Sequence, residues 1–163
     1  MIPIKQTASG NHNNQITKIF NRPLDPVDIC ANKISQILAK IAHIDFLTLP
    51  PSRLKPPNIS EKNAKNAIDT ANSIQIEKTY ALWDEITESI GSDATGATAS
   101  DYTKASYILN QFYLAKFQRD FPGFKLHALS TYCENTGADL DDAHVLVHLI
   151  HYMYLSCQIG LNP

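Results

Sequence analysis

Apolar residues recur at helical spacing along most of the chain. After Asp25 and Pro26 they fall at steps of three and four, which places one apolar face along a helix of about five turns. Aspartate is a favoured N-cap residue and proline suits the first helical position, so this pair predicts the start of the helix. The apolar face consists of Val27, Cys30, Ile34, Ile37, Ile41 and Ile44.

Four prolines in residues 49–59 cannot continue this helix, and they predict a stiff, extended connector. A second helical region is expected over residues 60–90, with Ser60 as its N-cap. A kink or break is expected near Asn72 and Ser73, because both side chains compete for backbone hydrogen bonds.

The last third of the chain predicts three more helices. Ser100 is expected to cap a helix that breaks at residues 121–123, and a short helix then runs to residues 135–137. Asp139 is expected to cap the last helix, whose apolar residues again step by three and four. No stretch alternates with the period of a strand. We therefore expect an all-α fold, a compact bundle of four to five helices in a single domain of residues 25–163.

Residues 1–24 differ from the rest in composition. They carry Lys5, Lys18 and Arg22 and no acidic residue, a local charge of +3, with many Asn, Gln and Ser residues. We expect a mobile polar tail, because the segment has little apolar material to offset the entropy of ordering. With Pro3 and Ile4 near its start, its composition resembles the leaderless N-termini of effectors that bacterial secretion machines inject.

The composition fits a single globular domain in a reducing compartment. The 163 residues are 44% hydrophobic with a net charge of −2. Cys30, Cys133 and Cys157 are far apart and contain no CxxC pair, so each is expected to be a core residue. We expect a cytoplasmic protein with no membrane span, since no secretory signal is visible and the apolar stretch 145–159 is too short for one. Export without a cleaved signal peptide is the alternative.

Three histidines form the most suggestive chemical feature. His144, His148 and His151 are spaced i, i+4 and i+7, so they share one side of the last helix, and Asp141 extends this stripe by one turn. Three imidazoles and a carboxylate could bind a transition metal, although neither HExxH nor ExxH occurs. The stripe could also titrate as a pH sensor. We favour a plainer interpretation, in which these side chains face solvent or hydrogen-bond to a neighbouring helix, and we expect no cofactor.

Aromatic residues are dense on the helix after Ser100. Tyr107 with Tyr113 or Phe117 could form an exposed patch for a protein partner or for self-association. The alternative is a helix that packs between two neighbours.

The remaining patterns argue against several functional classes. The chain has no GxSxG elbow and no local Cys–His signature, so we lean away from an enzyme. Nucleic-acid binding is disfavoured, because no Lys or Arg follows Lys125. We therefore expect a non-enzymatic protein–protein interaction module, such as an adaptor, a chaperone or an effector-like helical bundle. The alternative is a metal-binding helical bundle that uses the histidine stripe.

Overall fold

The computed structural model describes residues 24–48 and 56–162, and within these ranges it contains seven α-helices, one π-helix and no strand. The predicted all-α class is confirmed, but the expected number of four to five helices is too low. The elements are α2 (Pro26–Ile41), α3 (Ile59–Lys65), α4 (Thr70–Tyr80), α5 (Trp83–Gly91), α6 (Ala97–Phe112), η1 (Tyr113–Phe117, the π-helix), α7 (Phe121–Thr136) and α8 (Leu140–Leu155).

The count differs because the region expected as one kinked helix forms α3, α4 and α5. The first break follows Lys65, where Ala67 adopts a left-handed backbone conformation with φ of 52°. The predicted break near Asn72 and Ser73 is wrong, since both residues lie in the first turn of α4. Asp69 explains this, because its carboxylate accepts the Asn72 amide and caps that helix.

Aspartate caps also set three other helix starts. Asp25 accepts the Val27 amide, and Asp139 accepts the amides of Asp141 and Asp142, so both predicted caps are confirmed. Asp120 caps α7 by accepting the Gly123 amide. The predicted Ser100 cap is wrong, because α6 already begins at Ala97 after a left-handed Gly96.

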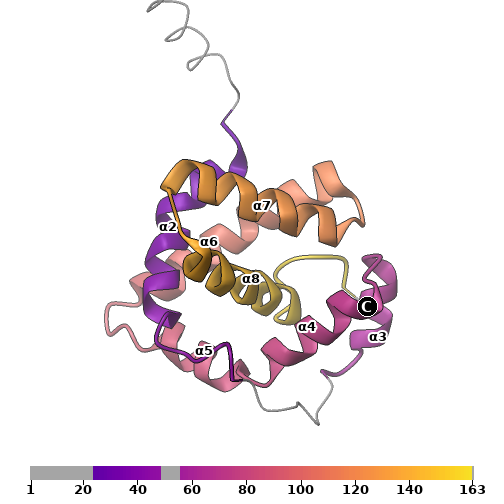
Figure 1. Ribbon diagram of the computed structural model, residues 1–163, viewed down its shortest axis with the longest axis horizontal. Coiled ribbons are helices and arrows are strands. Elements are labelled where there is room, and N and C mark those ends of the chain that lie inside the picture. The colour runs from indigo at the N-terminus through magenta and orange to yellow at the C-terminus, as the bar shows by residue number, and fades with distance from the viewer. Residues whose placement is uncertain (1–23, 49–55, 163) are drawn as a thin grey trace, which may run out of the picture.

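Helix α8 occupies the centre of the molecule. In Figure 1 it lies in the middle of the view, surrounded by α2, α7, α4 and α5, and it contacts α2, α4 and α7. Leu146, Leu149, Ile150, Met153 and Tyr154 are all buried. Beyond its first turn α8 carries no Asp, Glu, Lys or Arg, and such a helix is stable only when neighbours surround it, which accounts for this central position.

Helices α2, α6 and α7 pack together on one side of α8. The apolar face predicted for α2 is confirmed, since Val27, Cys30, Ile34, Ile37 and Ile41 are all buried. The helix ends before Ile44, but that side chain is buried as well.

A buried polar cluster fixes the C-terminal segment to α3. The Asn66 side chain accepts hydrogen bonds from the Tyr113 hydroxyl and the Leu161 amide, and it donates to the carbonyls of Lys62 and Leu161. The Lys62 ammonium donates to the Tyr154 carbonyl and lies 4.4 Å from the centre of that tyrosine ring. Burial lowers the pKa of Lys62.

The cysteines differ from the expectation in one case. Cys30 is buried, and burial raises the pKa of its thiol to about 11. Cys133 is half-buried, whereas Cys157 is exposed, so the prediction of a core position is wrong for Cys157. Its backbone leaves α8 with φ of 60°, which turns it out of the apolar face.

Two predicted segments lie largely outside the described residues. The polar tail of residues 1–24 is described only at Leu24, and the proline-rich connector only from Pro56 onward. Within residues 24–48 and 56–162, no helix combines the length and apolar content that crossing a membrane requires.

Candidate functional site

The three histidines of α8 point into the protein and lie close together. His148 is 5% exposed, His151 is fully buried and His144 is half-buried. The ring centres of His144 and His148 are 4.8 Å apart, and those of His148 and His151 are 6.2 Å apart. The plainer interpretation expected these side chains either to face solvent or to hydrogen-bond to a neighbouring helix. His148 and His151 do the second, and neither faces solvent.

Thr79 of α4 connects two of these rings. Its Oγ1 lies 2.8 Å from Nδ1 of His148 and 3.3 Å from Nδ1 of His151. Thr79 is itself completely buried. A buried polar group is costly without a partner, so this hydroxyl allows two imidazoles to occupy the core.

Lys125 of α7 extends the connection beyond His151. Its Nζ lies 3.3 Å from Nε2 of His151 and donates to Oδ1 of Asn72 at 2.6 Å. Burial lowers the pKa of Lys125, while the nearby Asp69 opposes this shift. Side chains of α4, α7 and α8 thus form one continuous set of hydrogen bonds.

These bonds assign the protons. A protonated lysine only donates, so Nε2 of His151 accepts from Lys125 and its Nδ1 carries the proton. That proton is donated to Thr79. The single hydroxyl proton of Thr79 has two acceptors within reach, Nδ1 of His148 at 2.8 Å and the Gln75 carbonyl at 3.3 Å, and the shorter contact assigns it to His148. His148 must then carry its proton on Nε2.

The environment keeps the connected histidines neutral. Burial lowers the pKa of His148 to about 4, helped by the nearby His144 and Lys125. Burial also lowers the pKa of His151 well below its usual value, and Lys125 adds to this shift. Neither ring is charged near neutral pH.

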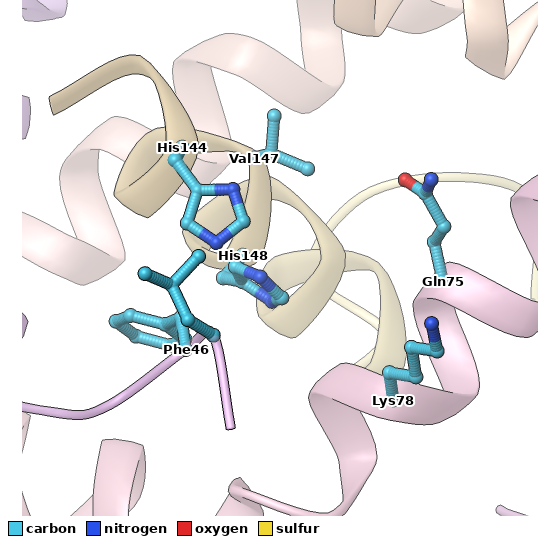
Figure 2. A pocket seen from close by; sticks show the side chains of 7 residues that line it. Phe46, Gln75, Lys78, His144, Val147 and His148 are labelled. Atoms are coloured by element: carbon cyan, nitrogen blue, oxygen red, sulfur yellow. The ribbon is translucent and has the colours of Figure 1, made fainter. Parts of the chain in front are cut away.

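A pocket of about 340 Å³ opens over this histidine face. Figure 2 shows His144 and His148 on α8, with Phe46 beside His148 and with Gln75 and Lys78 on α4, across from the two rings. We call this cavity the α8 pocket. It is lined by Phe46, Leu47, Gln75, Lys78, His144, Val147 and His148.

Two features of the α8 pocket bear on what it can bind. Phe46 stacks on His148 with ring centres 4.5 Å apart and an interplanar angle of 17°, which fixes the ring. Nε2 of His144 is buried and has no hydrogen-bond partner among the residues that the structure describes. A buried polar atom without a partner is unusual in a folded protein, and a bound group could satisfy it.

The predicted metal set is only partly brought together. His144 and His148 share the α8 pocket, but both nitrogens of His151 lie within hydrogen-bonding distance of Thr79 and Lys125, and Asp141 is exposed on the first turn of α8. In residues 24–48 and 56–162, no three His, Cys, Asp or Glu side chains are placed to hold a metal ion. Metal binding remains a prediction, which the metal content of the purified protein would test.

The predicted aromatic surface is also separated. Tyr107 is 66% exposed, whereas Tyr113 is completely buried, because its ring packs against Phe121 and Phe124 in the core. Phe117 is half-buried beside Phe124. Tyr113 therefore cannot belong to an exposed patch, and Tyr107 is the prominent exposed aromatic residue of the three.

Sequence reasoning missed Phe46, Thr79, Lys78 and Lys125. They lie on three different segments, and no local spacing links any of them to the histidines. One available signal was the lack of Lys and Arg throughout α8. After the first turn, imidazoles and tyrosine hydroxyls are its only polar groups, which fits a buried helix.

The comparisons with known proteins add no functional information. No family model, curated protein or solved structure matches this chain.

Proposed function

We propose that this protein is a non-enzymatic protein–protein interaction module and that its partner inserts one side chain into the α8 pocket. The proposal is based on one observation: the α8 pocket has an exposed apolar residue at its edge. Leu47 lines the pocket yet is 83% exposed, next to a buried Phe46. Exposed apolar residues beside a recess that fits one side chain are typical of the anchor points of protein interfaces.

The chemistry of the pocket supports binding over catalysis. None of its described lining residues carries a carboxylate, a thiol or a hydroxyl group, which leaves the Lys78 amine and the two imidazoles as the nucleophilic groups of the lining. A general base works best when its pKa is near the operating pH. Because the pKa of His148 is about 4, this ring is a weak base at neutral pH.

Site-specific photo-crosslinking in the source cells tests the proposal. A benzophenone amino acid at Leu47 should give a discrete cross-linked product, and the same group at Leu126 should not. Leu126 is 69% exposed on α7 and serves as the control for exposure alone. The substitution Gln75→Trp, at an exposed residue that lines the pocket, should abolish the product.

Ala94→Trp adds the same indole to an exposed loop between α5 and α6, so it should leave the product unchanged. Val147→Trp is a second variant that fills the pocket from α8. A product at Leu47 that survives both filling variants, in protein with unchanged helicity, would overturn the proposal.

A further inference from the structure

We infer that the group bound in the α8 pocket is the C-terminal carboxylate of a partner whose last residue is apolar, held by His144, His148 and Lys78. This inference rests on the proposed function and names the chemistry of the anchor. A C-terminal apolar residue carries a carboxylate and an apolar side chain on the same carbon atom. The pocket offers a matching pair of surfaces.

The polar surface of the pocket contains several groups that can donate hydrogen bonds. Nε2 of His148 carries a proton when Thr79 donates to Nδ1, so it is available to donate. Nε2 of His144 is buried without a partner in the part of the chain that the structure describes. Lys78 adds an ammonium group, and Gln75 adds an amide. Charge-assisted bonds of this kind hold a carboxylate more strongly than neutral ones.

The charges around the pocket favour an anion. Among the residues that the structure describes, no acidic side chain lines it, and the cations near its histidines are Lys78 of α4 and Lys125 of α7. A cleft with one sign of charge and apolar walls concentrates ligands of the opposite sign. An ammonium ligand would find no carboxylate in the lining.

The apolar surface lies beside these donors. Phe46, Leu47 and Val147 line the same cavity, and its volume of about 340 Å³ is at the lower end of the range typical of ligand sites. One terminal residue suits this space. An Asp or Glu side chain would present its carboxylate without an apolar branch for these three residues.

Binding of an anion here must couple to protonation. His148 is surrounded by His144 and His151 on α8, Lys78 on α4 and Lys125 on α7, and all of these are neutral or cationic. A carboxylate placed beside the ring favours its charged form and raises its pKa. Binding should therefore take up protons, and the affinity should rise as the pH falls from 7 toward 5, the side of neutrality on which the pKa of His148 lies.

Matched small probes test the inference by titration calorimetry on the full chain. N-acetyl-leucine carries the free carboxylate, N-acetyl-leucinamide lacks it, and N-acetyl-glutamic acid α-amide carries it on a side chain. We expect N-acetyl-leucine to bind at least ten-fold more tightly than either of the others. At pH 5 its binding enthalpy should vary with the ionisation enthalpy of the buffer, in the direction of proton uptake.

Variants assign the effect to the pocket. Lys78→Met and His144→Phe should each weaken binding of N-acetyl-leucine by about ten-fold, because each removes one donor to a charged group. Lys104→Met removes an exposed lysine of α6 and should leave the affinity unchanged.

Each other outcome counts against the inference in a distinct way. Equal binding of the amide would exclude carboxylate recognition, and tighter binding of the glutamic acid probe would exclude a C-terminal source. Lack of binding of all three probes at millimolar concentration would overturn the inference altogether. Failure of the proposed function is separate, because it would appear as cross-linking at Leu47 that does not depend on the pocket.

Discussion

Thr79 Oγ1 lies 2.8 Å from Nδ1 of His148, across the buried interface between α4 and α8. The same oxygen lies 3.3 Å from Nδ1 of His151, so one hydroxyl serves two imidazoles that are buried in the core. This contact determines how two histidines can be buried in the central helix. It also determines that the ring proton of His148 is on Nε2, the nitrogen that does not contact Thr79.

Replacing this hydroxyl should destabilise the fold. Thr79→Val keeps the shape of the side chain but leaves a buried nitrogen on each ring without its partner, so we expect a loss of about 1–3 kcal/mol in the free energy of unfolding. Urea denaturation followed by circular dichroism measures this. Thr103→Val, at an exposed threonine of α6, should change the stability by less than about 0.5 kcal/mol. Equal effects of the two substitutions would contradict the role assigned to Thr79.

The buried imidazoles should make stability depend on pH. The pKa of His148 falls from 6.5 in the unfolded chain to about 4 in the folded protein, so the unfolded state binds more protons between these values. The contribution of His148 to the free energy of unfolding is fully present above pH 6.5, and it is lost as the pH falls toward 4. Each unit of pKa difference is worth about 1.4 kcal/mol, so the loss should reach about 3 kcal/mol.

A matched variant separates this contribution from that of other groups. His148→Asn places an amide oxygen near the position of Nδ1, where it can accept from Thr79 without titrating. Urea unfolding at pH 7 and pH 4 should show a smaller loss of stability for the variant than for the original protein. Parallel pH profiles would show that His148 does not carry the effect.

The helical faces could be predicted from the sequence because they depend on local spacing. The seam of α2 and the caps Asp25 and Asp139 agree with the structure for this reason. The burial of the histidines could not be predicted, because it depends on partners far away in the chain. Thr79 is 69 residues from His148, and Lys125 is 26 residues from His151.

The break of the second helical region shows another limit of local patterns. The side chains of Asn72 and Ser73 compete for backbone hydrogen bonds, which destabilises the interior of a helix. For this reason the sequence predicts a break near them. The structure places them in a first turn, where such residues are well tolerated, because Asp69 supplies the cap. Which of several competing polar residues becomes the cap is decided by the surrounding packing.

The cluster around Asn66 should be required to hold the C-terminal segment. Asn66→Ala removes an acceptor for Tyr113 and both side-chain bonds to the backbone of Leu161. We expect a loss of about 2–4 kcal/mol in unfolding free energy, because several buried groups lose their partners. Hydrogen exchange should also speed up at residues 160–162. Asn32→Ala, at an exposed position of α2, is the control and should change neither quantity appreciably.

The proton positions in the histidine set can be observed directly. With Lys125 protonated, His151 should carry its proton on Nδ1 and His148 on Nε2, and the ¹⁵N chemical shifts of the rings at pH 7 distinguish these tautomers. Lys125→Met keeps an apolar stem but removes the only donor to Nε2 of His151 that the described part of the structure contains. We expect His151 in this variant to populate the Nε2–H tautomer. Thr79 can then donate to His151, so part of the His148 population should shift its proton to Nδ1.

Lys104→Met, which removes an exposed lysine of α6, should leave both tautomers unchanged. Identical ring shifts in the Lys125→Met variant and the original protein would mean that Lys125 does not set the direction of these hydrogen bonds.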